Sequence, residues 1–403
     1  MDNNTYFLND MQYAFLVGRQ SEGALCGVSC HIMAEYRCVS VHGIKEAAEK
    51  LVRRHKVLTS RITFDGEVVF DCAEKNILCS SDFSDLPDNE AELSLSEYRK
   101  KLSGRLMDIE NGEIFLIHII KMPRCVHLIF EGDCTAFDIT SFQILVRDIG
   151  KLLGGEALTD IPEGFEPYAN DLLPKYSPDE KKQSREYWRK KAVGMSEPPF
   201  CAEITGKCTY TAYIETVPQE GAERVRRFAK RMNCHEDIVL LTAFSMAAAQ
   251  ITGRERFLLN IPILDRYGLP PAAEGVAADF TRLLMFDVCV RKESFSACFD
   301  RLYADHREDM KQMAMSGMKV QKLLPKRNGS VTFSSHIFED MHIPALGRLI
   351  SITTETPDVL MDCEFFRVGN ELLLSFVTPD GAFESGKERE LLTAVGNIIL
   401  GIE

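Results

Sequence analysis

Hydrophobic and polar positions in the first half of the chain follow two different periods. Residues 28–36 alternate apolar and other side chains, which predicts a half-buried strand. Residues 43–55 instead place their apolar side chains along one face of a helix. Apolar runs at 114–120 and 126–130 predict two further strands, and residues 139–153 predict an amphipathic helix. This half is therefore expected to mix strands and helices.

The second half of the chain repeats this mixture. Strands are predicted at 208–216, 257–263, 283–290, 359–368 and 371–377, and helices at 220–232, 236–251, 294–315 and 387–399. The last two strands are expected to form a hairpin that turns at Gly369 and Asn370. A charged helix at 179–191 is predicted to connect the halves, because Pro178 and Asp179 suit its first turn.

Chain length and the order of these elements together predict two lobes. The chain has 403 residues, 45% of them hydrophobic, which exceeds the size at which a single core usually stops growing. The boundary is expected between residues 175 and 195. We therefore predict a mixed α/β fold, of the α+β sandwich type, with one lobe at 1–177 and the other at 178–403.

The charge balance argues against a nucleic-acid partner. The formal net charge is −13, whereas nucleic-acid binders usually carry a basic surface. The richest basic cluster, residues 319–327 (KVQKLLPKR), is short and broken by apolar residues. It is expected to be a solvated helix face, with docking of an acidic partner protein as the alternative.

Cysteine usage and the N-terminal sequence bear on location. The 13 cysteines are scattered and include no CxxC pair, so no disulfide framework is indicated. Cys26 and Cys30 are expected to be small half-buried residues rather than metal ligands. The first residues contain no secretory signal, and no apolar run is long enough to cross a bilayer. A reduced, soluble, cytoplasmic protein without a membrane association is therefore expected.

The segment from Glu131 to Asp138 is predicted to be a tight loop between a strand and a helix. Asp138 stands where a helix N-cap belongs, and Ser141 follows at the distance from which it can bond back to it. Asp133 follows directly after an apolar strand, so its carboxylate must find a cation or hydrogen-bond donors.

The spacing D-x-x-x-x-D-x-x-S in residues 133–141 (DCTAFDITS) resembles the signature of heterocyclization domains of nonribosomal peptide synthetases. That signature replaces the H-H-x-x-x-D-G of ordinary condensation domains. Nine further blocks resemble family blocks in the same order: 8–19 (LNDMQYAFLVGR), 27–31 (GVSCH), 54–58 (RHKVL), 187–189 (YWR), 259–266 (LNIPILDR), 278–281 (ADFT), 316–320 (SGMKV), 331–335 (VTFSS) and 354–362 (TETPDVLMD). The resemblance covers nearly the whole chain.

The resemblance implies both a fold and a reaction. It implies two chloramphenicol-acetyltransferase-like lobes arranged as a V-shaped pseudo-dimer with a central tunnel. It implies that a Cys, Ser or Thr held as a carrier thioester is acylated by an upstream thioester, and that the amide then cyclises to a thiazoline or oxazoline. The implied partners are donor and acceptor peptidyl carrier proteins and adenylation enzymes in trans, because the chain is expected to be free-standing. The only cofactors implied are the phosphopantetheine arms of those carriers.

The resemblance also implies the residues that carry the chemistry. Asp362 would be the carboxyl that moves protons in cyclodehydration, and Ser334 stands where the family carries Thr. Their alternatives are a surface Asp on a hairpin strand and a satisfied strand hydroxyl. The candidates for lining the tunnel are Thr135, Asp279, Thr281, Arg282 and Thr332. Asp133, Asp138 and Ser141 are expected to structure the loop rather than to react.

Departures from the family pattern add three expectations. Ser334 keeps the hydroxyl but loses the methyl group that restricts its rotamer. Glu355 and Asp358 replace two Gln-type positions, and their charges are expected to raise the pKa of Asp362. Arg282 replaces a small residue, and is expected either to pair with an Asp such as Asp133 or to narrow the tunnel.

Other functions are weighed against this one. His336 and Asp340 fit the H-x-x-x-D pattern of related CoA-dependent acyltransferases, although no Gly follows and the position is unusual. No HExxH spacing, P-loop or G-x-G-x-x-G occurs, so neither metal nor nucleotide binding is predicted. A condensation-only enzyme and a degenerate scaffold that only docks carriers remain as alternatives.

Overall fold

The computed structural model describes residues 5–22, 25–28, 30–70, 75–161, 175–202, 204, 209–264, 266, 275–325, 329–384 and 386–403. The chain forms two compact units, and two segments from the second half of the chain belong to the first unit. The first unit contains Met1–Leu173, Leu264–Thr281 and Met341–Pro357, and the second contains Pro174–Ile263, Arg282–Asp340 and Asp358–Glu403. The sequence predicted two lobes but did not anticipate these two excursions into the first unit.

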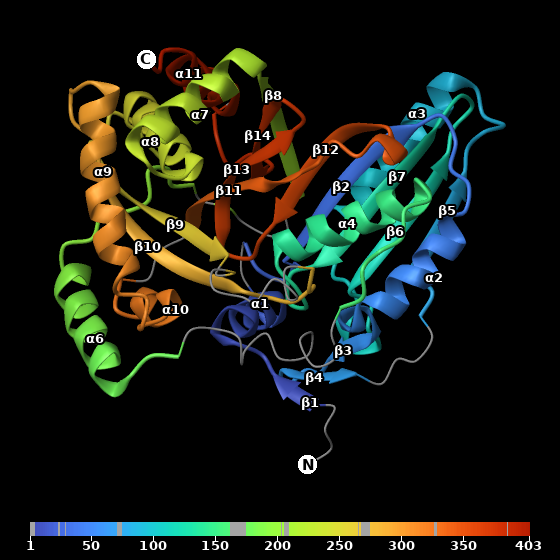
Figure 1. The fold of residues 1–403 in the computed structure, drawn as a ribbon, viewed down its shortest axis with the longest axis horizontal. Helices are drawn as coiled ribbons and strands as arrows, with labels where there is room; N and C mark the ends of the chain where they lie inside the picture. The colour runs from blue at the N-terminus through green and yellow to red at the C-terminus, as the bar shows by residue number, and fades with distance from the viewer. Residues whose placement is uncertain are drawn as a thin grey trace. The chain divides into compact units, whose positions relative to one another are not determined.

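The first unit is built on a five-stranded sheet and a small three-stranded sheet. Its elements are β1 (Thr5–Phe7), α1 (Asp10–Gln20), β2 (His31–Cys38), α2 (Ile44–Arg54), β3 (Ser60–Ile62), β4 (Glu67–Phe70), β5 (Leu78–Asp82), α3 (Asp88–Leu102), β6 (Phe115–Lys121), β7 (Val126–Asp133), α4 (Ile139–Leu153) and β12 (Arg348–Glu355). The five-stranded sheet has the order β12-β2-β7-β6-β5, and the small one β1-β4-β3. β12 comes late in the chain, yet it lies beside β2 (Figure 1) and pairs with it antiparallel.

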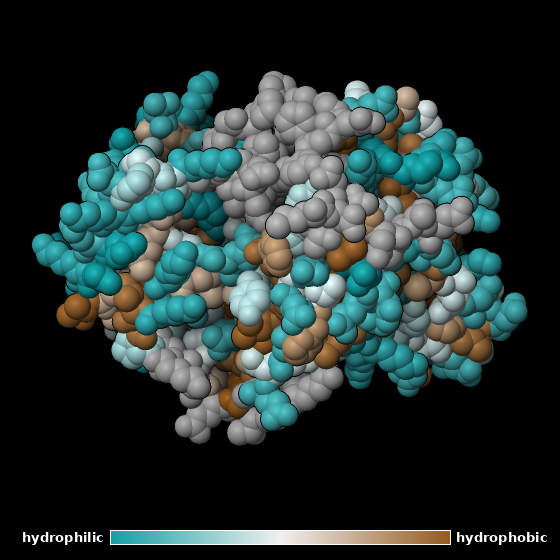
Figure 2. Space-filling view, turned by 90° about the horizontal axis from the view of Figure 1, so that it is seen from below, coloured by the Kyte–Doolittle hydropathy of each residue, from teal (hydrophilic) through white to brown (hydrophobic). Residues whose placement is uncertain are grey.

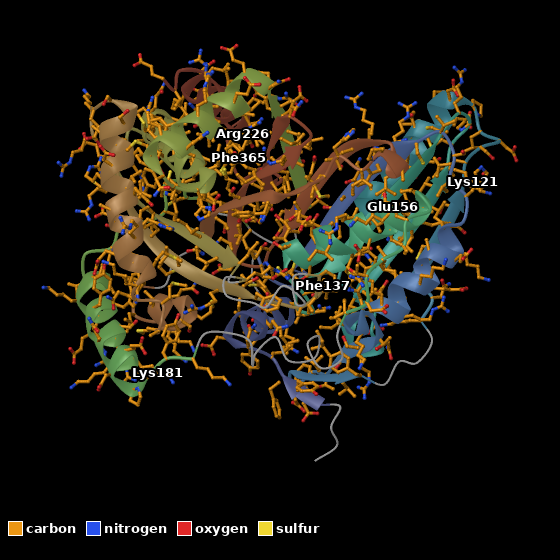
Figure 3. The ribbon with its side chains drawn as sticks, in the orientation of Figure 1. Lys121, Phe137, Glu156, Lys181, Arg226 and Phe365 are labelled. Atoms are coloured by element: carbon orange, nitrogen blue, oxygen red, sulfur yellow. The ribbon has the colours of Figure 1, made fainter. Side chains whose placement is uncertain are left out.

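The two faces of the five-stranded sheet differ in character. On one face Phe115 and Phe130 pack with Phe142 of α4, together with Phe137 just before that helix (labelled in Figure 3). On the other face α3 packs Ala91, Leu95 and Leu102 against Ile120 and Ile129. Both faces are therefore covered, as a two-sided α/β layer requires.

The second unit is built on a six-stranded sheet of order β10-β9-β11-β13-β14-β8. Its elements are α6 (Pro178–Ala192), β8 (Tyr210–Val217), α7 (Gln219–Met232), α8 (Glu236–Thr252), β9 (Arg256–Leu264), β10 (Thr281–Cys289), α9 (Phe295–Met310), α10 (Gly317–Gln321), β11 (Ser330–Asp340), β13 (Val359–Val368), β14 (Glu371–Pro379) and α11 (Lys387–Leu400). Phe244 of α8 packs against Phe333 of β11 and Phe376 of β14, so these two strands turn apolar side chains toward that helix.

Most predicted elements are confirmed within a few residues. α6 begins with Ser177 as N-cap and Pro178 in its first turn, and the β13–β14 hairpin turns at Gly369, which has φ +61. The helix predicted at 294–315 was too long, because α9 ends at Met310 and α10 begins separately at Gly317. The elements that were not predicted at all include β1, α1, β3, β4, β5, α3 and β12. Cys208 and the last two residues of the basic cluster, 326–327, lie outside the described residues.

The charged residues, 27% of the chain, predict a largely hydrophilic surface. On the face that Figure 2 shows, hydrophilic side chains predominate and hydrophobic ones form small scattered groups. Among the helices of the described residues, none is long and apolar enough to cross a membrane.

Candidate functional site

Asp133 ends β7 and is fully buried. Its Oδ2 accepts a hydrogen bond from Arg19 Nη1 at 2.7 Å, and its Oδ1 accepts one from the Thr135 backbone N–H at 2.9 Å. The predicted cation is thus present, but it is Arg19 of α1 rather than Arg282. A buried carboxylate held by an arginine and a backbone donor is an anchor for the loop, because its lone pairs are already engaged.

Asp138 is the N-cap of α4, as predicted. Its Oδ1 accepts hydrogen bonds from the Ser141 backbone N–H at 2.7 Å and from Arg266 Nη2 at 2.9 Å. Its Oδ2 accepts one from the Phe280 backbone N–H at 3.0 Å. The Ser141 hydroxyl donates to the Ala278 carbonyl at 2.6 Å. This part of the motif therefore fixes the start of α4 against residues 278–280. Asp265, which precedes Arg266 in the block at 259–266, lies outside the described residues.

Asp279 is a buried carboxyl beside this network. Its side chain accepts hydrogen bonds from Asn9 Nδ2 at 2.7 Å and from the Thr281 backbone N–H at 3.1 Å. Burial, together with the nearby charge of Asp138, raises the pKa of Asp279 to about 7. The Thr135 hydroxyl is also buried, and it makes no hydrogen bond with any residue that the structure describes.

The raised pKa of Asp279 predicts a pH-dependent stability. Because its folded-state pKa lies above the value of 3.8 for an unperturbed group, Asp279 stabilises the fold when protonated, and this contribution is lost as pH rises through about 7. Relative to the wild type, Asp279→Asn is expected to gain about 2 kcal/mol of unfolding free energy between pH 5 and pH 8. Urea unfolding of both proteins at the two pH values measures this gain. Equal pH dependence of both proteins would contradict the assignment.

The sheet of the second unit carries the other predicted residues on one face. β11 and β13 run parallel, with Thr332 opposite Asp362 and Ser334 opposite Glu364. Phe333 of β11 points toward α8, so its alternating neighbours Thr332 and Ser334 point to the other face of the sheet. That face therefore presents two adjacent hydroxyl–carboxyl pairs.

Burial decides between the alternatives for these residues. Asp362 is only 5% exposed, so it is not a surface residue of a hairpin strand. Ser334 is equally buried. The Thr332 hydroxyl is likewise buried and makes no hydrogen bond within the described part of the chain. The structure thus places two buried hydroxyls beside two buried carboxyls.

His336 belongs to the same sheet face. Its Nε2 lies 3.4 Å from Glu364 Oε1, and both side chains are buried. Asp340 lies on the same strand, β11, where its Oδ1 accepts a hydrogen bond from the Gly369 backbone N–H at 2.8 Å. The H-x-x-x-D pattern therefore lies within strand β11, whose pairing with β13 shifts register between His336 and Asp340, rather than in a loop.

Glu355 and Asp358, the two acidic residues that depart from the family pattern, each have a structural role in their own surroundings. Glu355 ends β12 in the first unit, where it accepts hydrogen bonds from the Ser103 hydroxyl and the Gly104 backbone N–H and lies 3.7 Å from His31 Nδ1. Asp358 has a positive φ of 61°, a conformation that Asp tolerates better than most side chains do. Its carbonyl accepts a hydrogen bond from the Ser330 backbone N–H. These contacts explain both residues without reference to Asp362.

Arg282 is held inside the second unit. Its guanidinium donates to the Tyr176 hydroxyl at 2.7 Å and to the Met313 carbonyl, and it lies over the Tyr176 ring at 5.3 Å. It therefore ties the start of β10 to the segment that precedes α6. Thr281, next to it, is half-buried.

Comparison with known proteins identifies the family to which the chain belongs. Residues 2–337 match the model of the condensation domain. The chain belongs to the condensation domain family. It resembles the EpoB cyclization-docking bidomain from Sorangium cellulosum with a TM-score of 0.87 at 20% identity, over 99% of this chain and 85% of that one. The starter condensation domain of rhizomide synthetase RzmA matches with a TM-score of 0.76 at 14% identity, over 99% and 94%. The predicted mixed α/β fold of two lobes is thereby confirmed.

Two curated relatives of this condensation domain are synthetases. Pyochelin synthetase PchE of Pseudomonas aeruginosa is 25% identical over 96% of this chain, and phenyloxazoline synthase MbtB of Mycolicibacterium paratuberculosis is 24% identical over 96%. The chain spans only 28% and 35% of their lengths. The match to the family model and to these relatives thus confirms the resemblance seen in the sequence.

Sequence reasoning missed several residues of the site. Arg19 and Asn9 lie in the opening block, but nothing in the pattern indicated which carboxylates they would meet. Arg266 belongs to the block at 259–266, but nothing in that block indicated its contact with Asp138. Glu364 could have been found, because a residue two positions after Asp362 on a strand must share its face.

Proposed function

We propose that this condensation domain joins two carrier-bound thioesters and then closes the new amide into a thiazoline or oxazoline ring. The observation that carries the proposal is the pairing of Thr332 with Asp362 and of Ser334 with Glu364 on one buried face of the second unit's sheet. The likeness to the EpoB cyclization domain and to PchE and MbtB supports it.

The condensation step does not need a catalytic histidine. A neutral amine attacks a thioester readily once both are held together, and effective molarity alone can lower the barrier by about 7–11 kcal/mol. The motif loop fits this view, because Asp133 and Asp138 are engaged by Arg19, Arg266 and backbone donors. These aspartates are proposed to maintain the loop and to take no part in proton transfer.

The cyclodehydration step does need proton transfer. The side-chain thiol or hydroxyl of the acceptor adds to the amide carbonyl, and the resulting hydroxyl must then leave as water while the nitrogen loses its proton. Asp362 is proposed as the proton-carrying carboxyl and Ser334 as a hydroxyl beside it. Thr135, Thr281, Arg282, Thr332 and Asp279 stay proposed as residues along the substrate path.

The proposed partners are donor and acceptor peptidyl carrier proteins, loaded by adenylation enzymes and supplied in trans. Their phosphopantetheine arms would carry both substrates, so no further cofactor is proposed.

Incubation with two separately purified carriers tests this function. One carrier bears an acyl group and the other bears Cys, Ser or Thr, and intact mass spectrometry reads the product on the acceptor. A product lighter than the linear amide by one water supports heterocyclization in trans. A linear amide alone would instead support a condensation-only enzyme, and absence of any product would support a docking scaffold.

A further inference from the structure

On the polar face of the second unit's sheet, β13 presents the two carboxyls Asp362 and Glu364, and the reaction proposed above uses only one of them. Asp362 and Glu364 alternate on β13, so both point to the same face. Glu364 is 2% exposed, and Ser334 is its direct neighbour on β11. On the strands that flank β11 and β13, Asn260 of β9 is in register with Thr332 and Ser375 of β14 with Glu364, and both side chains are neutral. Two acidic groups are thus set side by side in a buried region.

His336 distinguishes Glu364 from Asp362. The imidazole Nε2 lies 3.4 Å from Glu364 Oε1, and its ring packs against Phe366 with centroids 5.1 Å apart. An imidazole beside a carboxylate fixes its orientation and can carry a compensating positive charge. The residue facing Asp362 across the strands is the hydroxyl Thr332. Glu364 thus has both a hydroxyl and an imidazole beside it, and Asp362 has a hydroxyl beside it, an arrangement suited to separating a base from an acid.

We propose that Glu364, positioned by His336, accepts protons during ring closure while Asp362 donates them. This inference rests on the proposed cyclodehydration and assigns it a second carboxyl. The Thr332 and Ser334 hydroxyls, which can both donate and accept, lie next to the two carboxyls and return the proton from Glu364 to Asp362.

The proton balance of this scheme closes. In ring formation the acceptor's thiol or hydroxyl bonds to the amide carbon, its proton passes to Glu364, and the carbonyl oxygen takes a proton from Asp362. After the proton is returned, the C–O bond breaks and the hydroxyl leaves as water with a second proton from Asp362. The nitrogen gives its proton to Glu364 as the C=N bond forms. One water is lost, and a second transfer of the proton from Glu364 to Asp362 returns both carboxyls to their starting states.

The substitution Glu364→Gln tests the proposal, because it keeps the shape of the side chain and removes its basicity. With both loaded carriers, we expect ring closure to slow by about 10²- to 10⁴-fold, the usual contribution of a general base. Linear amide formation should stay within about twofold of wild type, since it needs no base from this pair. Glu364→Asp should restore part of the ring closure, and His336→Asn should slow it to an intermediate rate.

Two controls separate a chemical role from a structural one. Glu371→Gln removes an exposed carboxylate from the adjacent strand, and should change neither rate. Circular dichroism and thermal melting identify any variant that fails to fold, in which case Glu364→Asp and His336→Asn decide the question. A wild-type protein that makes heterocycle and a folded Glu364→Gln variant with an unchanged ratio of ring to linear product would overturn this inference alone. A wild-type protein that makes no heterocycle would overturn the proposed function as well.

Discussion

Asp362→Asn is expected to abolish most ring closure while leaving amide formation intact. The substitution keeps the size of the side chain but removes the proton that must reach the departing oxygen. Loss of a general acid usually slows a step by about 10²- to 10⁴-fold. Because Asp362 is only 5% exposed and lies beside the Thr332 hydroxyl, solvent is poorly placed to replace it.

The measurement is the ratio of linear to cyclised product on the acceptor carrier, followed in time by mass spectrometry. Linear amide should accumulate with the variant, and the wild type should convert it. Thr332→Val and Ser334→Ala, tested alongside, show which hydroxyl the carboxyl uses. If Asp362→Asn forms the ring at the wild-type rate, Asp362 is not the acid and its burial has another cause.

Arg19→Met is expected to destabilise the protein by about 3–5 kcal/mol, the usual consequence of leaving a buried charge without its partner. The Arg19–Asp133 pair is the clearest such case near the motif, because the side chains are 9% and 0% exposed and the contact is 2.7 Å. Urea unfolding compares the two proteins. A second substitution, Asp133→Asn, in the Arg19→Met background should recover part of the loss, since it removes the unpaired charge.

The exposed pair Lys121–Asp82 provides a matched control. Its side chains are 59% and 54% exposed, so Lys121→Met should cost less than about 1 kcal/mol. Equal effects of Arg19→Met and Lys121→Met would show that Asp133 is not an anchor for the loop.

Local patterns predicted much of the fold because each was decided by residues close in sequence. The cap at Asp138, the start of α6 at Ser177 and the turn at Gly369 all follow from a few adjacent side chains. α3 escaped prediction because nearly half of its residues are charged and it buries only Ala91, Leu95 and Leu102. Composition alone did not distinguish that helix from a solvated loop.

The candidate site was predicted less completely, because its contacts join residues far apart in the chain. Blocks that resemble family blocks in the same order suggested Asp362 and Ser334 as site residues. Only strand pairing showed that Ser334 faces Glu364 and that Thr332 faces Asp362. Likewise, no local signal links Glu355 to Ser103 and Gly104, which precede it by about 250 residues. Such pairings depend on the whole topology.

The position of β12 at the edge of the first unit's sheet has a consequence for how the protein matures. During synthesis, β2 is made early, but its antiparallel neighbour Arg348–Glu355 leaves the ribosome more than 300 residues later. Until then β2 presents an unpaired edge, which is a hazard for pairing with other chains. The first unit therefore cannot complete its sheet until Arg348–Glu355 has been synthesised, and pairings of such long range are slow to form. We expect nascent chains that stop before residue 348 to aggregate or to depend on chaperones, although most of the first unit's sequence is already present.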